Sequence, residues 1–202
     1  MAPTVSTVAS QTASAFAREM GLTNALVTHI DCGDPDERCA SGPNGGTPEV
    51  EAQLFDAVLL FQEAHSVPVK HDARKDSRGQ RLFVRTGCAL CHVSSLPVGM
   101  PGGERAVIHP YTDLLVHSLG ECLADRDLND EPVQSEWRTA PLWGIGAAAE
   151  SGQPVRLLHN GRARSIDEAV LWHEGEANGA RERYSNLSAA DRRRLIEWIE
   201  QL

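Results

Sequence analysis

The chain has 202 residues, of which 41% are hydrophobic and 23% charged, and its formal net charge is −9. This composition is typical of a folded globular protein and excludes a disordered polymer. The acidic balance argues against nucleic-acid binding, which depends on basic side chains that neutralise phosphates. No apolar run is long enough for a membrane span, and the first residues lack the features of a secretory signal.

Two helices are predicted in the first third of the chain, over residues 5–20 and about 48–65. The second has Thr47 as a candidate N-cap and Pro48 at the first helical position. Their apolar stripes consist of Val5, Val8, Phe16 and Met20 in the first helix and of Val50, Leu54, Val58 and Phe61 in the second. The polar and basic stretch at 66–76 has the composition of a linker.

A third helix is predicted to open near Ser77, because Ser77 and Gln80 match the capping-box pattern. It leads into a cysteine motif that begins at Cys88. Residues 93–164 are rich in Gly and Pro and are predicted to be mostly irregular, apart from one short helix around 112–118. No stretch alternates apolar and polar residues convincingly, so no strand is expected.

Two helices are predicted near the C-terminus. Ser165 and Glu168 form a capping-box pattern ahead of a helix over 166–173. Ser188 and Asp191 give a similar pattern ahead of the last helix. The apolar stripe of that last helix consists of Leu195, Ile199 and Leu202.

The residues from Cys88 to His92 read CALCH and form a CxxCH motif. Two thiols one helical turn apart can each add to one vinyl group of a porphyrin, and the adjoining histidine then reaches the iron. A zinc half-site would need a second CxxC pair, and a thioredoxin-like redox motif would need a βαβ context; both are missing. The motif therefore predicts one covalently attached haem c, bound through Cys88 and Cys91 with His92 as an axial iron ligand.

The second axial position of the iron decides the function. Its candidate ligands are Met100, His109, His117, His159 and His173. Met100 follows His92 so closely that reaching the opposite haem face is difficult. His173 is better placed, because it shares a helical stripe with Ile166 and Val170 that is predicted to be buried. An ordinary core histidine is the alternative interpretation of this position.

Three cysteines lie outside the CxxCH motif. Cys32 and Cys39 are separated by six residues in a loop rich in Asp, Gly and Pro. An oxidising compartment favours their pairing, although the spacing alone leaves it open. Cys122 is predicted to be a buried thiol that acts as a small hydrophobe.

Several segments resemble the C-terminal haem domain of the bacterial di-haem oxidoreductases, a family similar to di-haem cytochrome c peroxidases and MauG-type enzymes. These segments are PYTDLLVH (110–117), EWRTAPLWGIG (136–146), LLHNGRARSIDEAVLWHEGEA (157–177) and the closing LSAADRRRLIEWIEQL. FAREMGLTNAL (16–26) and GPNGGTPEVEAQLFDAV (42–58) are similar to the segment that joins the two haem domains. The resemblance implies an all-α, cytochrome c-like fold. It consists of a helical segment at 1–70 packed on the core and a cytochrome c domain with long haem-wrapping loops at 71–202.

The resemblance also implies roles for single residues. It places His173 at the distal ligand position of this haem, in agreement with the helical phase. Arg138 matches an arginine expected near the haem propionates, where charge-assisted pairs form, and an ordinary surface arginine is the alternative. His159 stands at the histidine of a His-Asp-Gly motif and is expected to hydrogen-bond near the haem.

The sequence departs from the family pattern in three places. The family has two haems, whereas this chain has one CxxCH motif. Asn160 replaces the aspartate of the His-Asp-Gly motif, and Ser118 replaces an acidic residue that usually follows the other histidine. The peroxidase reaction needs an open iron site and a relay haem, and this chain carries only the domain that usually serves as the relay.

Electron transfer is the leading functional hypothesis. With His92 and His173 both on the iron, no coordination site remains for peroxide or oxygen, and the iron cycles between its ferric and ferrous states. A haem peroxidase or oxidase related to the di-haem peroxidases is the alternative, and it requires that His173 be displaced or never bound. A third hypothesis is a domain that binds a partner or senses a ligand through the haem.

The expected partner is another redox protein, such as a periplasmic or secreted oxidoreductase or a second cytochrome. The acidic charge would steer a basic partner toward the domain. A periplasmic or extracellular location is expected, because covalent haem attachment takes place outside the cytoplasm, and the chain is then a mature or excised domain. The linker-like stretch at 66–76 is consistent with a longer multidomain protein.

Overall fold

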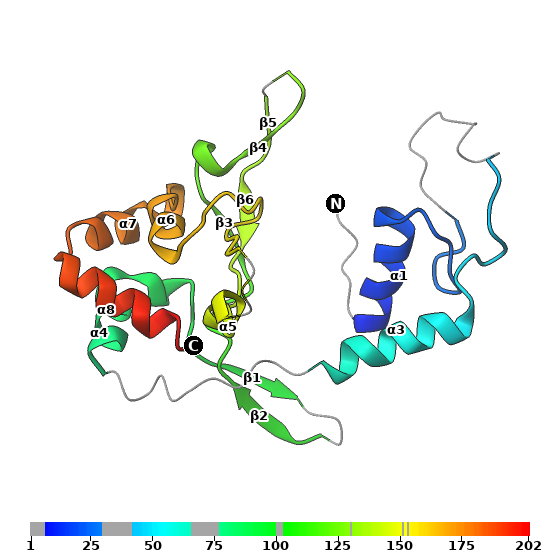
Figure 1. The fold of residues 1–202 in the computed structure, drawn as a ribbon, viewed down its shortest axis with the longest axis horizontal. Coiled ribbons are helices and arrows are strands. Elements are labelled where there is room, and N and C mark those ends of the chain that lie inside the picture. The colour runs from blue at the N-terminus through cyan, green and yellow to red at the C-terminus, as the bar shows by residue number, and fades with distance from the viewer. Residues whose placement is uncertain are drawn as a thin grey trace. The chain divides into compact units, whose positions relative to one another are not determined.

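The computed structural model describes residues 7–29, 42–65, 77–99, 103–129, 131–150, 152 and 154–202. The chain divides into two compact units, Met1–Ser66 and Val67–Leu202, and each is described by itself (Figure 1). Some predicted features lie outside the described residues, namely Val5, Cys32, Cys39, Met100 and the linker at 66–76, which includes the expected domain boundary. The packing of the N-terminal segment on the haem domain stays a prediction.

The N-terminal unit is built on two helices, α1 (Val8–Glu19) and α3 (Ala52–Ala64). The hydroxyl of Thr7 accepts from the backbone N–H of Ser10 and caps α1. The buried core of this unit consists of Ala13, Val50 and Phe55, with Phe16, Leu22, Val27 and Leu59 packed against it.

The predicted helix start at Pro48 is wrong. Glu51, rather than Thr47, is the N-cap of α3. The residues before it are held by another segment instead: the N–H of Val50 donates to the carbonyl of Thr23 over 2.9 Å, and the Glu49 carboxylate accepts from the N–H of Thr23 over 3.0 Å. These contacts keep the stretch from joining the helix.

The predicted apolar stripes of the two N-terminal helices are also wrong in most positions. Val8 on α1 and Met20, the residue after its last turn, are exposed, and so are Leu54 and Phe61 on α3. The buried residues of α1 are Thr12, Ala13 and Ala17, and α3 buries Phe55. The contact face therefore combines small side chains of α1 with the rings of Phe16 and Phe55, whose centroids lie 6.2 Å apart.

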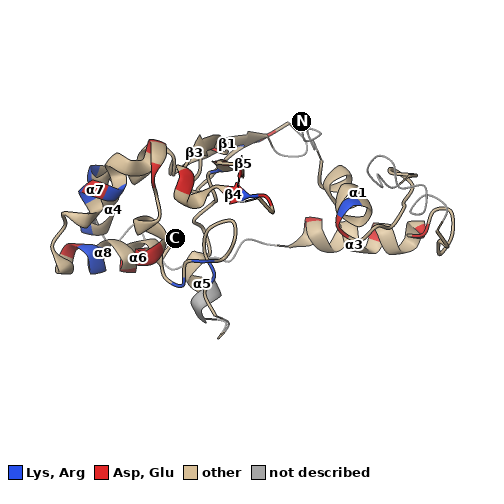
Figure 2. Ribbon diagram, turned by 90° about the horizontal axis from the view of Figure 1, so that it is seen from above, with Lys and Arg blue, Asp and Glu red and all other residues tan. Residues whose placement is uncertain are grey.

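The C-terminal unit is built on α4 (Ser77–Thr86), α7 (Asn178–Ser185) and α8 (Ala189–Ile199), and α4 packs on both other helices. α4 begins at the predicted residue, and its N-cap position lies outside the described residues. Arginines are concentrated on these three helices, which carry most of the blue segments in Figure 2. No helix among the described residues is both long and apolar enough to cross a membrane.

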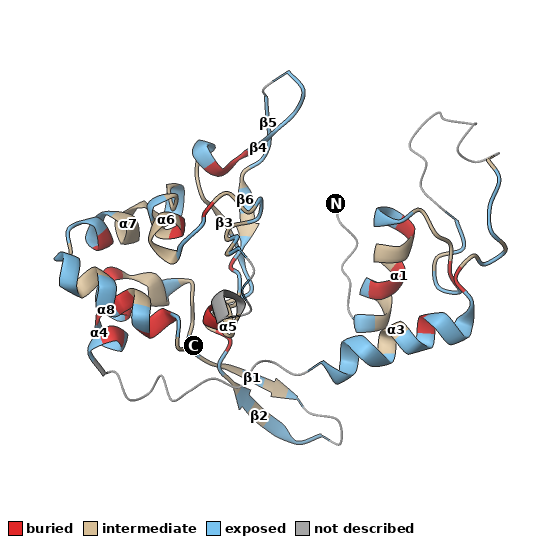
Figure 3. Ribbon diagram, in the orientation of Figure 1, coloured by how far each residue is buried: buried red, intermediate tan, exposed pale blue. Residues whose placement is uncertain are grey.

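The core of the C-terminal unit lies between α4 and α8 (Figure 3). It consists of Leu82, Phe83, Tyr184, Leu195, Trp198, Ile199 and Leu202. The rings of Phe83 and Trp198 lie 5.0 Å apart between centroids, and the ring of Tyr111 meets Trp198 edge-on at 5.7 Å. The predicted stripe of the last helix is confirmed, since all three of its residues belong to this core.

Two predicted helix starts are confirmed. The hydroxyl of Ser165 accepts from the N–H of Glu168 at the start of α6 (Ile166–Leu171) over 3.1 Å. The hydroxyl of Ser188 accepts from the N–H of Asp191 at the start of α8, also over 3.1 Å. Each bond satisfies one of the N–H groups that a first helical turn leaves without a partner.

The all-α prediction is wrong, because residues 93–164 contain strands. The antiparallel pairs in the described residues are β1 (Leu96–Gly99) with β2 (Arg105–Ile108), β3 (Val116–Ser118) with β6 (Glu136–Arg138), and β4 (Asp125–Arg126) with β5 (Pro132–Gln134). The helix expected around 112–118 is a loop followed by β3. Strands this short show no alternating pattern, and β3 pairs with a segment distant in sequence, so local periodicity could not predict them. A short helix, α5 (Ile145–Glu150), was also not predicted.

Candidate functional site

The CxxCH motif lies on a sharp turn at the end of α4. Cys88 opens a single 3-10 turn, η2 (Cys88–Leu90), and Gly87 before it has a φ of +88°, in the left-handed region that favours glycine. The guanidinium of Arg183 fills the space that a side chain at position 87 would need, and its Nε donates to the Thr86 carbonyl over 2.9 Å. The packing of α7 on α4 therefore fixes the backbone at Thr86 and Gly87, directly before the motif.

Both thiols of the motif are free and protonated at neutral pH. Neither is part of a disulfide. Burial raises the pKa of the Cys88 thiol, whose Sγ lies 3.2 Å from the Thr86 hydroxyl. Burial and the nearby carboxylates of Asp113 and Glu176 raise the pKa of Cys91.

The imidazole of His92 is neutral and has a fixed tautomer. Its Nδ1 lies 3.0 Å from the carbonyl oxygen of Tyr111. Because a carbonyl only accepts hydrogen bonds, Nδ1 carries the proton and Nε2 bears a lone pair. Burial, with a smaller contribution from the nearby His173, lowers the pKa of His92 to about 4. The carbonyl of Ala140 is a second backbone partner of this ring. At neutral pH His92 is therefore a neutral imidazole, which is the form that a metal binds.

The imidazole of His173 has the same chemistry. It follows the end of α6, and its Nδ1 lies 2.7 Å from the carbonyl oxygen of Ala169. Burial lowers its pKa. The Coulomb interaction with His173 lowers the pKa of His92. The two rings are therefore near each other, although their positions differ by 81 in the sequence. That Cys88, Cys91, His92 and His173 together hold one haem stays a prediction.

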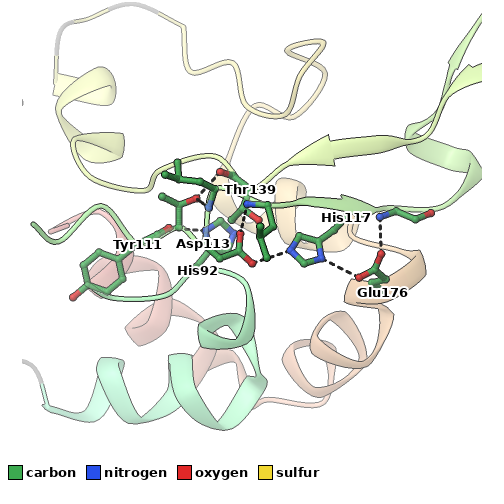
Figure 4. A network of polar contacts seen from close by, with 10 residues as sticks. His92, Tyr111, Asp113, His117, Thr139 and Glu176 are labelled. Atoms are coloured by element: carbon green, nitrogen blue, oxygen red, sulfur yellow. Dashed lines mark hydrogen bonds and ion pairs between the residues drawn. The ribbon is translucent and has the colours of Figure 1, made fainter. Parts of the chain in front are cut away.

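A polar network borders these groups (Figure 4). Nε2 of His117 lies 2.9 Å from Oδ2 of Asp113, and its Nδ1 lies 2.9 Å from Oε2 of Glu176. The hydrogen bond to Glu176 raises the pKa of His117 most, and the hydrogen bond to Asp113 raises it as well. With both ring nitrogens bound to carboxylates, His117 is held as an imidazolium and is not available as an iron ligand in this structure.

A comparison with protein families decides the relationship of this chain. A family model described as "Di-haem oxidoreductase, putative peroxidase" matches residues 7–202. The chain belongs to the di-haem oxidoreductase family. Comparisons with curated proteins and with solved structures found no match.

The donor groups of this di-haem oxidoreductase domain fit the haem that its family implies. Two protonated thiols would be the groups that form thioether bonds, and two neutral imidazoles would be the candidate iron ligands. Beside them, Leu114, Leu115 and Val116 leave at least half of their surface exposed. A continuous apolar run of this kind is typical of a surface that another group covers. The chain is a haem protein.

The structure shows other contacts for the remaining candidate residues of the domain. Nε2 of His159 binds Oδ1 of Asp125 over 3.0 Å, and its ring stacks on Trp137 with 3.6 Å between centroids. Nδ1 of His109 lies 3.2 Å from the Ser94 carbonyl. Arg138 stands on the exposed β6. The expected contacts of His159 and Arg138 with the haem stay predictions.

The prediction that Cys122 is buried is wrong. Cys122 is exposed on the turn η3 (Glu121–Leu123). The carbonyl of Cys122 accepts from Nη1 of Arg162 over 2.6 Å, and its thiol hydrogen-bonds to Glu174. Leu123, the next residue, is fully buried instead, so the turn presents Cys122 to solvent.

Sequence reasoning missed the carboxylates that surround His117. The spacing of Asp113 and His117 matched a helix, and the structure brings them together across a loop. Glu176 lies three residues after His173 and could have been noted as a neighbour of the distal ligand. Ligand atoms of Cys91, Asp113 and His117 lie within 4.8 Å of one another, but a thioether at Cys91 would remove the thiolate that a metal ion needs.

The ion pairs of His117 should make stability depend on pH. Because the pKa of His117 is raised in the folded state, its contribution is complete below about pH 6.5 and is lost as the pH rises through the raised pKa. Urea unfolding of the wild type and His117→Gln, at pH values between about 6 and 9, measures this contribution. The difference in unfolding free energy should shrink toward high pH.

Arg78→Gln is the matched control for this experiment. It removes an ion pair of 2.7 Å between Arg78 and Asp191, and the hydrogen bond from Arg78 lowers the pKa of the Asp191 carboxyl, which is therefore charged over this whole range. Its effect should be constant with pH. A His117→Gln difference that stays constant, or grows with pH, would contradict the assignment of His117 as an imidazolium.

Proposed function

We propose that this domain transfers electrons through one haem c, attached to Cys88 and Cys91 and ligated by His92 and His173. The observation that carries the proposal is the pair of neutral imidazoles, each with its Nδ1 proton directed to a backbone carbonyl. This arrangement leaves two Nε2 atoms for one iron. A bound haem would supply the ferric–ferrous couple, and a second histidine gives a lower reduction potential than methionine.

The residues of the chain have separate tasks in this proposal. Cys88 and Cys91 hold the cofactor, and the carbonyls of Tyr111 and Ala169 orient the two imidazoles. Partial burial of both rings lowers their pKa values and makes their protonation unfavourable. No residue in this arrangement has to move for an electron to pass, which suits rapid transfer.

The second candidate function is a peroxidase, because the matching family model names this activity. The reaction needs an iron position that peroxide can reach. In this chain His173 would occupy that position, and one CxxCH motif provides one covalent haem site. The peroxidase hypothesis therefore requires release of His173, or a second haem domain in a longer protein.

Replacement of His173 separates the two functions. The ferric wild-type holoprotein should show a low-spin absorption spectrum without the weak band typical of methionine ligation. His173→Ala should give a high-spin spectrum, and added imidazole should restore the low-spin form. His109→Ala, a histidine bound to the Ser94 carbonyl, is the control and should leave the spectrum unchanged. A high-spin wild type, or an unchanged His173→Ala spectrum, would refute bis-histidine ligation.

The proposed partner is a basic redox protein, such as a periplasmic or secreted oxidoreductase or another cytochrome. The charge of the chain is unevenly distributed: Met1–Ser66 contains nine acidic and two basic residues, and Val67–Leu202 contains nineteen acidic and seventeen basic residues. The N-terminal unit therefore carries most of the net negative charge and would attract a basic surface. The same proposal includes a periplasmic or extracellular location, which cell fractionation tests.

The acidic unit should control the association rate with a basic electron acceptor. Exposed carboxylates on α3 can be neutralised in the double variant Asp56→Asn, Glu63→Gln. Electron transfer to a basic cytochrome, followed by stopped flow at low salt, should become slower, and added salt should reduce the difference. Arg193→Gln on α8 is the control of opposite sign. Equal rates for all three proteins at low salt would contradict steering by charge.

A further inference from the structure

One polar network connects the two chain segments that carry the proposed iron ligands (Figure 4). At one end, the Tyr111 carbonyl accepts from Nδ1 of His92. The next residue, Thr112, donates its N–H to the carbonyl of Val93 over 3.0 Å. The loop that contains Asp113 is therefore fixed to the His92 segment by two hydrogen bonds.

The other end of the network holds the segment after His173. Glu176 lies in the short turn η4 (Gly175–Ala177), and its Oε1 accepts from the N–H of Ser118 over 2.9 Å. Gly175 has a φ of +54°, and a Cβ at this position would meet the Ser118 carbonyl. The backbone of η4 thus packs directly on β3, and only glycine permits this approach.

His117 joins the two ends. Its Nε2 binds Asp113 and its Nδ1 binds Glu176, each over 2.9 Å. The His117 and Asp113 side chains are mostly buried, with 18% and 13% of their surface exposed, whereas Glu176 is 57% exposed. Oδ1 of Asp113 also accepts from the N–H of Leu115 over 2.9 Å, which fixes the carboxylate. The network therefore has a rigid, enclosed side toward His92 and a more accessible side toward His173.

We propose that His117 is a positioning residue that holds His173 on the iron. His173 itself lies between the end of α6 and η4, where its N–H makes only a local bond to the Val170 carbonyl. Glu174, the next residue, pairs with Arg181 of the following helix. The bond between Glu176 and His117 is a side-chain link between this segment and the loop attached to His92. The inference rests on the bis-histidine ligation proposed above.

Carbon monoxide binding to the reduced holoprotein tests this role. Carbon monoxide needs a free sixth position, so its apparent affinity and observed binding rate scale with the fraction of molecules in which His173 has left the iron. His117→Gln should raise that fraction and accelerate binding about tenfold, which corresponds to a shift of about 1.4 kcal/mol in the ligation equilibrium. Stopped-flow absorption of the ferrous protein measures the rate.

Glu176→Gln is the second variant, because an exposed side chain tolerates this change without loss of the fold. The amide can still accept from Ser118, so carbon monoxide binding should accelerate less than in His117→Gln. Arg78→Gln removes a different ion pair from the same unit and should bind carbon monoxide like the wild type. A role in general stability alone would affect all three variants and would leave their ligation unchanged.

The outcomes separate the inference from the proposed function. A wild type that binds carbon monoxide without a slow ligand-release step has an open iron, which overturns bis-histidine ligation and the positioning role together. A closed wild type whose two network variants match Arg78→Gln overturns the positioning role alone. The positioning role is supported if the wild type is closed, both network variants bind carbon monoxide faster than the wild type, and Arg78→Gln binds it at the wild-type rate.

Discussion

The hydrogen bonds from Nδ1 of His92 to the Tyr111 carbonyl and from Nδ1 of His173 to the Ala169 carbonyl determine what this site can bind. A carbonyl oxygen accepts only, so each ring must keep its proton on Nδ1. Burial disfavours a second proton. Both rings are therefore neutral and direct a lone pair from Nε2, which is the form that a metal requires.

The rest of the C-terminal unit supports this constraint. The core between α4 and α8 fixes the turn that contains the cysteines. Arg183 stabilises the start of that turn by donating a hydrogen bond to the Thr86 carbonyl. The short ladders position the loop of Tyr111 and Asp113 beside it, and His117 connects this loop to η4. Helices thus hold the thiols and the distal histidine, whereas irregular segments and strands supply the groups that orient them.

CxxCH is a local motif whose spacing follows from the cofactor, so the sequence alone could identify it. The helix start at Ile166 was also predicted, but Ile166, Val170 and His173 are only half-buried, and the role of His173 as a ligand stays a prediction. The strands were missed because each has four residues or fewer. In addition, β3 pairs with β6, which is distant from it in the sequence. The buried face of α1 was missed because alanines form it. The carboxylates around His117 depend on tertiary contacts that a single sequence does not contain.

Electron paramagnetic resonance of the ferric holoprotein tests the central claim most directly, because the spin state of the iron reports whether both Nε2 atoms are bound. The account predicts one low-spin species whose signal is lost in His173→Ala, with haem still attached to the denatured chain. A high-spin signal in the wild type would contradict ligation by two imidazoles. Release of the haem on denaturation would contradict attachment through Cys88 and Cys91.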